Sequence, residues 1–341
     1  MKIKKLTSYY SLFLVPIFFG SCIETFQPDV ELDSSYVVVN GFISNEDSIV
    51  VNISRSIDPE SGIISNIVGS TVTLFGDDGT EEILLDIGNG MYAGETIGRP
   101  NVNYSLEIIL PNARVIASDW QLLKEGAEVG EISILRATRS EYFNGYENEI
   151  DGLDLNLYLN DENFNSRFYR WELEGTYEFH SVLSSDICYV TDFFKGNFIL
   201  GESISNDKDI VSTKLAFLES NGKKFAWGYS MEVKQYALNK DAYNYWKKID
   251  DQQNNVGSVF DSPPAQIVGN LNYVNQNDLQ VLGFFEASYV AKSRIFIKPS
   301  DFIIEPILET SPCYFDNPPG WCSDCTKLVG STREKPIFWP N

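Results

Sequence analysis

The sequence predicts a mainly β protein: an N-terminal immunoglobulin-like β-sandwich over residues 35–122, followed by a larger β-rich domain over residues 128–300 with one α-helix. Three observations predict this class. Apolar and polar residues alternate with period two in many short segments rich in β-branched side chains. Asn-Gly and Asp-Gly turns, which suit tight hairpins, separate several of these segments. Residues 240–253 alone follow helical spacing.

The first 21 residues have the composition of a secretory signal peptide. Three lysines, Lys2, Lys4 and Lys5, precede an apolar run from residue 12 to residue 19, and two small residues follow it. The run is too short to cross a bilayer, which takes about 20 apolar residues. We therefore expect residues 1–21 to be removed during export.

Cys22 is the expected site of lipid attachment. The ending Gly20-Ser21-Cys22 resembles the lipobox of bacterial lipoproteins, whose cysteine is acylated and becomes the mature N-terminus, although Phe19 stands where leucine is usual. Two or three acyl chains anchor a protein far more firmly than one. The alternative is an ordinary cleaved signal with an incidental cysteine. Residues 22–34 are short and polar, so we expect a tether between the membrane and the first domain.

The chain is strongly acidic. It has 26 Lys and Arg against 48 Asp and Glu, a formal net charge of −22, and removal of the three signal lysines leaves 23 against 48, or −25. Binding of nucleic acid requires clustered basic residues, so the composition argues against nucleic acid as a partner. It also argues against peripheral binding to anionic lipid. The expected membrane contact is therefore the lipid at Cys22.

The alternation predicts seven short strands within residues 35–122. Turns at residues 76–79, 88–90 and 111–112 separate some of them. Seven strands in about 85 residues, with a turn roughly every 8–12 residues, are typical of an immunoglobulin-like sandwich. The expected strands are 36–42, 48–54, 70–75, 82–87, 91–94, 102–110 and 113–118.

Strand-like alternation resumes after a break at residues 123–126 and continues to residue 298. A C-terminal tail, residues 301–341, follows. The expected strands are 129–137, 153–159, 168–174, 186–191, 210–218, 227–238, 267–271, 279–287 and 294–298.

The expected helix covers residues 240–253. Asn239 can cap its N-terminus, and Asp241 in the first turn complements the helix dipole. Aromatic residues at helical spacing belong to a core more often than to a binding site, so we expect one buried stripe. That stripe consists of Ala242, Tyr245, Trp246 and Ile249.

Four cysteines follow Cys22: Cys188, Cys313, Cys322 and Cys325. An even number in an exported protein indicates disulfides, and four cysteines allow three pairings, among which the sequence does not choose. The Cys322-x-x-Cys325 spacing also occurs in metal sites and redox pairs. However, the chain has no second such pair and one distant histidine, whereas zinc usually takes four Cys or His ligands. We expect structural disulfides that hold the tail to the body, and no metal site.

The sequence carries no recognisable catalytic motif. His180 is the only histidine that could activate a serine or cysteine nucleophile, and no Gly-x-Ser-x-Gly turn accompanies it. We expect it to be exposed or hydrogen-bonded instead, and we expect no cofactor because phosphate and dinucleotide motifs are absent. Paired carboxylates could serve a glycosidase, but 48 acidic residues do not identify a pair. We expect core packing for Trp171, Trp227 and Trp246.

Several segments form a recognisable set when they are taken in order. They are residues 38–43 (Val-Val-Asn-Gly-Phe-Ile), 243–248, 260–270 and 281–285 and, in the tail, 322–325, 330–332 and 335–339. This set resembles family 4249 of the domains of unknown function, which are lipoproteins of Gram-negative bacteria. The family has no established activity, so the resemblance assigns no catalytic residue. It implies an outer-membrane location and a TonB-dependent transporter as candidate partner. Residues 23–26 lack the acidic run that often marks surface export, which leaves the membrane face undecided.

Three functions are compatible with the sequence. The first, which we favour, is a non-catalytic accessory that binds a partner or a nutrient at the outer membrane. The second is a surface carbohydrate-active hydrolase that uses paired carboxylates. The third is a structural protein of the cell envelope.

Overall fold

A computed structural model of the chain describes most of the sequence beyond the expected tether. The described residues are 36–57, 62–143, 145–159, 166–194, 198–202, 211–220, 224–254, 267–276, 278–298, 312–314 and 316–340. The expected signal peptide, the tether and Cys22 lie outside these residues, and so does most of the segment 260–270. None of the helices within the described ranges has both the length and the apolar composition needed to cross a bilayer.

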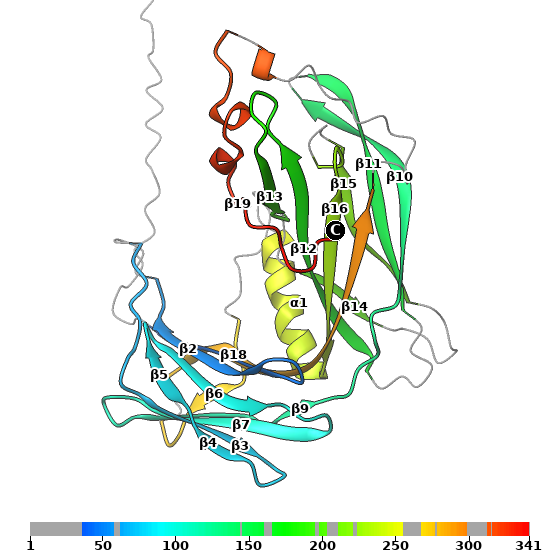
Figure 1. Ribbon diagram of the computed structural model, residues 1–341. Coiled ribbons are helices and arrows are strands. Elements are labelled where there is room, and N and C mark those ends of the chain that lie inside the picture. The colour runs from blue at the N-terminus through cyan, green and yellow to red at the C-terminus, as the bar shows by residue number, and fades with distance from the viewer. Residues whose placement is uncertain are drawn as a thin grey trace, which may run out of the picture. The chain divides into compact units, whose positions relative to one another are not determined.

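Ten of the described strands form the largest sheet (Figure 1). They are β1 (Val37–Ser44), β2 (Ser48–Arg55), β5 (Leu85–Gly88), β6 (Met91–Ile97), β12 (Phe168–His180), β13 (Ile187–Asp192), β14 (Ile199–Glu202), β16 (Tyr229–Leu238), β18 (Val281–Ile297) and β19 (Ser331–Thr332). Their order is β19-β13-β12-β16-β18-β1-β2-β6-β5, with β14 also on β12. Neighbouring strands are antiparallel except for β1 and β18, which run parallel.

Two smaller sheets contain the other described strands. The first has the order β17-β8-β7-β3-β4 with β9 on β7, and the second has the order β10-β11-β15. Their bounds are β3 (Thr71–Gly76), β4 (Glu81–Ile83), β7 (Val102–Ile109), β8 (Val115–Ser118), β9 (Gln121–Leu123), β10 (Glu131–Phe143), β11 (Tyr146–Leu159), β15 (Val211–Glu219) and β17 (Leu271–Tyr273). The described helices are α1 (Lys240–Asn254) and three 3₁₀ turns, η2 (Pro312–Tyr314), η3 (Gly320–Cys322) and η4 (Cys325–Lys327).

The prediction of a mainly β protein with sandwich-like packing and one α-helix is confirmed, and most expected strands are found within a few residues of their expected bounds. One expectation about the closing strands is wrong. Residues 279–287 and 294–298 were expected as two strands, but β18 runs unbroken from Val281 to Ile297. Residues 288–293 contain no Gly, Pro or Asn to start a turn, and residues 289–293 pair with β16.

Two other segments differ from expectation. The segment expected as one strand at residues 82–87 is divided between β4 and β5, which belong to different sheets, because Leu84 turns inward between them and is buried. The strand expected at 267–271 starts only at Leu271, as the short β17.

The boundary that we expected between residues 122 and 128 does not separate the sheets. β1 lies between β2 and β18 in the largest sheet, so Asn40 is opposite Asn52 on one side and Phe284 on the other. β17 likewise pairs with β8. By their contacts, residues 35–341 form one compact unit.

Alternation along β12 determines which side chains lie under α1. Tyr169 and Trp171 point into a core that β12, β13 and β16 share with the β10-β11-β15 sheet. Because successive strand residues face opposite sides, Arg170 and Glu172 lie on the other face. α1 packs on that face, against β12, β16 and β18 (Figure 1). A buried apolar cluster that includes Tyr236, Ala242 and Phe284 holds the helix there.

Candidate functional site

A cavity of about 510 Å³ lies where α1 meets the largest sheet. Small-molecule sites usually have volumes of roughly 300–1,000 Å³, so this cavity is large enough for a ligand. Its aromatic lining consists of Phe42, Tyr236, Tyr245, Trp246 and Phe284. Its polar lining consists of Asn40, Asn52, Arg170, Glu172 and Glu286. We refer to it below as the α1 cavity.

A buried ion pair forms part of the wall of the α1 cavity. Arg170 and Glu286 are each only 4% exposed, and Arg170 Nη2 donates a hydrogen bond of 3.1 Å to Glu286 Oε1. Arg170 Nη1 donates to Glu172 Oε1. Burial opposes the charge of Arg170, but the carboxylates of Glu286 and Glu172 outweigh it, so the pKa of Arg170 lies above its ordinary value.

Hydrogen bonds satisfy the buried Glu286 carboxylate. Ser288 Oγ donates to Glu286 Oε1 at 2.7 Å, and Trp246 Nε1 donates to Glu286 Oε2 at 2.5 Å. A buried ion pair is tolerated when such additional bonds are present. The network therefore connects β12, β18 and α1, and it fixes the position of the Trp246 ring.

The Arg170 guanidinium also contacts two aromatic rings. Its Cζ lies 4.0 Å from the Tyr236 ring centroid and 4.3 Å from that of Trp246, both within cation–π range. Arg170 Nε is buried and has no hydrogen-bond acceptor among the described residues. The cation is thus held by two carboxylates and two rings.

Glu172 is the most accessible charged group of this network. Its side chain is 35% exposed, and its Oε2 accepts a hydrogen bond of 2.9 Å from the Tyr236 hydroxyl. Burial, and next the charge of Glu172, raise the pKa of Tyr236 above its usual range, so the hydroxyl remains a donor at neutral pH. One arginine and two glutamates leave the wall with one excess negative charge.

Two amides stand side by side on the β1–β2 part of the cavity. Asn40 and Asn52 are directly opposite each other in the antiparallel register. Asn52 Nδ2 lies 3.0 Å from Met91 Sδ, and a thioether is a weak acceptor. Both amides therefore keep most of their hydrogen-bonding capacity. Asn40 belongs to the segment 38–43 that the sequence singled out, whereas no feature of the sequence singled out Asn52.

The stripe on α1 differs from the expectation that it would be core. The buried helix residues are Ala242 and Tyr243, whereas Tyr245, Trp246 and Ile249 are half-buried and line the α1 cavity. The reason is that the sheet under this part of the helix presents the polar Arg170 and Glu286. The predicted cap is present, because Asn239 Oδ1 accepts a hydrogen bond of 2.8 Å from the Ala242 amide.

The other tryptophan predictions have mixed outcomes. Trp171 is fully buried, as expected. The expectation that Trp227 packs in the core is wrong: β16 starts only at Tyr229, and Trp227 is 53% exposed. Its ring stacks on His180 with centroids 3.8 Å apart. His180 Nε2 lies 2.5 Å from Glu178 Oε1, so the histidine is hydrogen-bonded, and it does not line the α1 cavity.

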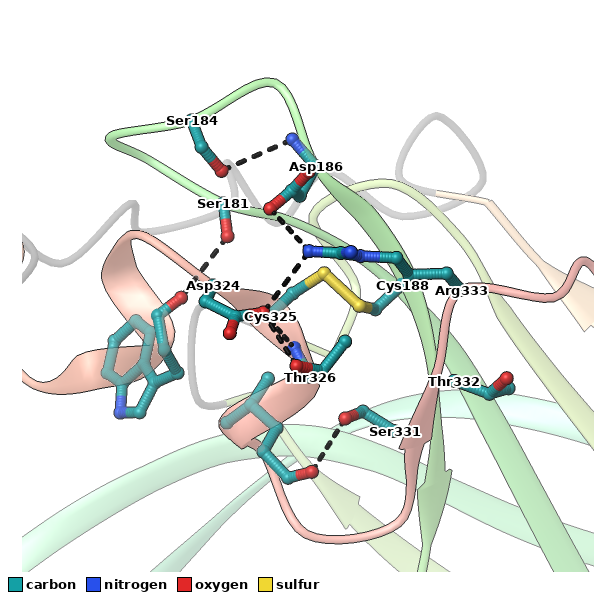
Figure 2. The surroundings of a disulfide bond; sticks show 12 residues. Ser181, Ser184, Asp186, Cys188, Asp324, Cys325, Thr326, Ser331, Thr332 and Arg333 are labelled. Carbon is teal, nitrogen blue, oxygen red and sulfur yellow. Dashed lines mark hydrogen bonds and ion pairs between the residues drawn. A yellow bond between two sulfur atoms is a disulfide. The ribbon is translucent and has the colours of Figure 1, made fainter.

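The four cysteines beyond Cys22 form two disulfides, as the sequence predicts. Cys188 of β13 is bonded to Cys325 of η4 (Figure 2). Cys313 is bonded to Cys322. The two cysteines of the Cys-x-x-Cys pair therefore have different partners. No group of three or more His, Cys, Asp or Glu side chains in the described ranges could hold a metal ion.

Polar contacts surround the Cys188–Cys325 bond. Arg333 Nη2 contacts Asp186 at 2.9 Å and Asp324 at 3.3 Å (Figure 2). Asp324 accepts hydrogen bonds from the Thr326 hydroxyl and amide, which lower the pKa of its carboxyl. Ser181 Oγ donates to the Trp321 carbonyl at 3.2 Å. The disulfide thus belongs to an arrangement that fixes the tail on β13 and indicates a structural role.

Comparison with known proteins places the chain in a family. A scan against protein families matches residues 23–294 to a domain of unknown function, DUF4249. A search of curated proteins found no match. The matched range covers more than half of the chain, including β1, β12, α1 and most of β18, which line the α1 cavity. The chain therefore belongs to the DUF4249 family.

Proposed function

We propose that this protein is a lipid-anchored outer-membrane lipoprotein that binds a partner or a nutrient without catalysing a reaction. The observation that carries the proposal is the α1 cavity, where a buried ion pair holds an aromatic wall in place. Burying charged groups costs free energy, and such networks occur where a fixed geometry is needed. A cavity of ligand size with this construction supports a binding role.

The hydrogen bonds of the cavity favour binding over catalysis. Glu172 and Glu286 both accept hydrogen bonds from Arg170. A glycosidase needs one carboxyl that can donate a proton, and a carboxylate engaged by a guanidinium has none to give. His180, the only histidine in the sequence that could serve as a base for a nucleophile, is stacked on Trp227 at a different place.

A surface carbohydrate-active hydrolase is the second candidate. One observation favours it, since two carboxylates, Glu172 and Glu286, line the same cavity as the Trp246 ring. The full chain incubated with soluble polysaccharides would then release reducing ends, and Glu172→Gln would abolish that release. An absence of release would leave the binding function as the better account.

The anchoring part of the proposal is tested by lipid labelling. Cells that express the full chain are fed an alkyne-tagged palmitate, and the protein is examined for the label and for its membrane fraction. The ending Gly20-Ser21-Cys22 supports labelling at Cys22, so Cys22→Ser should remove the label and release the protein from the membrane. Ser34→Ala in the tether is the matched control and should keep both. A labelled Cys22→Ser protein would contradict the proposal.

The partner is tested by co-purification. The outer membrane is dissolved in a mild detergent and the tagged full chain is recovered together with the proteins bound to it. A TonB-dependent transporter is the partner that we propose, and its recovery with the wild-type chain is the supporting result. Recovery of the chain alone, from membranes that contain such transporters, would contradict the transporter as partner.

A further inference from the structure

We propose that the α1 cavity binds a neutral, polyhydroxylated ring, the chemistry of an uncharged sugar residue. This inference rests on the proposed binding function and specifies its ligand. Three features of the cavity carry it: charges that are already paired within the wall, a pair of amides on β1 and β2, and aromatic rings held in place by the protein.

The charges of the cavity disfavour an ionic ligand. The one cation among the described lining residues, Arg170, already bonds two carboxylates, so an anion would meet excess negative charge. A cation would find no free carboxylate oxygen on Glu286, because its two oxygens accept hydrogen bonds from Arg170, Ser288 and Trp246. Each Glu172 oxygen also has a donor, Arg170 or the Tyr236 hydroxyl. The pairing of these groups favours an uncharged ligand.

The amide pair matches hydroxyl groups. An amide offers both donors and an acceptor, and a hydroxyl does the same, so two neighbouring amides can bind two neighbouring hydroxyls. Asn40 and Asn52 are directly opposite in register, and directly opposite residues have Cβ atoms about 5 Å apart. The Met91 thioether on Asn52 is a weak partner that a hydroxyl can replace.

The aromatic lining matches the apolar C–H faces of a sugar ring. The Trp246 ring is held by its hydrogen bond to Glu286 and by Arg170. Tyr245 is stacked on Phe284 with centroids 4.6 Å apart. Rings that are already fixed lose little conformational freedom when a ligand arrives, which favours binding. The cavity therefore offers apolar faces and hydroxyl partners together.

The test uses the full chain in a detergent without a sugar headgroup, since such a headgroup would compete. Calorimetric titrations compare four neutral disaccharides, maltose, cellobiose, lactose and N,N′-diacetylchitobiose, with choline as a cation and galacturonate as an anion. We expect at least one disaccharide to bind and both ions to fail. The double variant Asn40→Ala/Asn52→Ala and the single variant Trp246→Ala should each weaken that binding about tenfold or more.

Matched variants outside the cavity serve as controls. Trp120→Ala removes an exposed tryptophan, and Asn272→Ala removes an exposed asparagine, and both should bind as the wild type does. If Trp246→Ala does not fold, the double amide variant still tests the inference. It should fold, because Asn40 is exposed and Asn52 is half-buried.

Three results would overturn the inference: no disaccharide binds, choline or galacturonate binds instead, or the amide variant binds the disaccharide as tightly as wild type. Binding of an ion that Trp246→Ala abolishes would refute the sugar while leaving the binding function intact. The proposed binding function has its own tests. It would be contradicted if the protein hydrolysed a polysaccharide, or if the wild-type chain carried no lipid label and recovered no transporter.

Discussion

Arg170 shows how one residue can connect the fold to the site. Its sequence neighbours Tyr169 and Trp171 belong to the core on one side of β12, and Arg170 turns to the other side under α1. It is nevertheless buried there, because the Tyr236 and Trp246 rings lie against its guanidinium. The residue thereby holds Glu286 and, through it, the wall of the α1 cavity.

Replacement of Arg170 should therefore destabilise the protein strongly. Arg170→Met leaves Glu286 buried without a cation, a change that typically costs about 3–5 kcal/mol. Urea unfolding followed by circular dichroism measures this loss. Arg136→Met is the control, since Arg136 makes an exposed pair with Asp151 at 3.4 Å, and such pairs contribute roughly 0–1 kcal/mol. Equal losses for the two variants would refute the structural role of Arg170.

Tyr177 should make stability depend on alkaline pH. Burial, and next the charge of Asp192, raise the pKa of Tyr177 to about 12. The unfolded chain titrates this group near pH 10, so its contribution is complete below pH 10 and is lost as the pH rises towards 12. By pH 11 the loss is about 1.4 kcal/mol.

The measurement compares urea unfolding at pH 9 and pH 11. Tyr177→Phe lacks the titrating group and should lose about 1.4 kcal/mol less than the wild type between these pH values. Tyr142→Phe changes an exposed tyrosine instead and should lose as much as the wild type. An unchanged pH dependence in Tyr177→Phe would contradict the assignment.

At the scale of elements, β18 depends on a glycine where it meets β1. Gly283 has φ +93°, and a Cβ built there would lie 2.0 Å from the Val39 carbonyl oxygen. Gly283→Ala should cost about 3 kcal/mol or more, from strained backbone and steric overlap together. Gly62→Ala, with φ +67° and no atom within 4 Å, isolates the backbone strain and should cost only about 1 kcal/mol. Thermal unfolding measures both, and similar losses would contradict the close approach of β1 and β18.

The two disulfides should contribute unequally. Cys188 and Cys325 are 137 positions apart, whereas Cys313 and Cys322 are 9 apart. In the chain-entropy account, a longer closed loop stabilises more, which gives about 5 kcal/mol for the first bond and about 3 kcal/mol for the second. Double Cys→Ala variants of each pair, which leave no free thiol beyond Cys22, should therefore differ in unfolding free energy. A larger loss for the 313–322 pair would contradict this order.

The sequence predicts strands and the helix well because local alternation and turn residues determine them. It predicts less well the surroundings of a side chain when segments far apart in the chain form them. Trp246 has the spacing of a core residue, and only the placement of Arg170 and Glu286 opposite it makes it part of a cavity. Asn52 is unremarkable in sequence, and it pairs with Asn40 only through the β1–β2 register. The local signal for the site was the set of recognisable segments, because residues 38–43, 243–248 and 281–285 contain Asn40, Trp246 and Phe284 of the cavity lining.

At the scale of the whole molecule, the largest sheet joins strands from both of the domains that we expected from the sequence. β1 has its partners in β2 and in β18, and one buried core contains Leu271 and Phe285 together with buried residues from Val37 to Leu123. The stability of the first segment is therefore tied to the last third of the chain.

This connection predicts cooperative unfolding. The full chain should unfold in one calorimetric transition, and residues 35–122 expressed alone should not give the dispersed amide spectrum of a folded protein. Without β18, β1 would have an unpaired edge and the core would lose Phe285 and Val281. A folded 35–122 fragment, or two separate transitions in the full chain, would contradict the prediction.

The pairing of β1 with β18 also sets the order of events after synthesis. Asn45 and Val290, which exchange two hydrogen bonds, are 245 positions apart. At about 5–20 residues per second, roughly 10–50 s separate the synthesis of these two residues. During that time the valine- and isoleucine-rich hairpin of β1 and β2 has no parallel partner. Contacts this distant in sequence also slow folding and prolong exposure to aggregation. The β1–β2 hairpin of this protein therefore completes its pairing only when the final third of the chain is available.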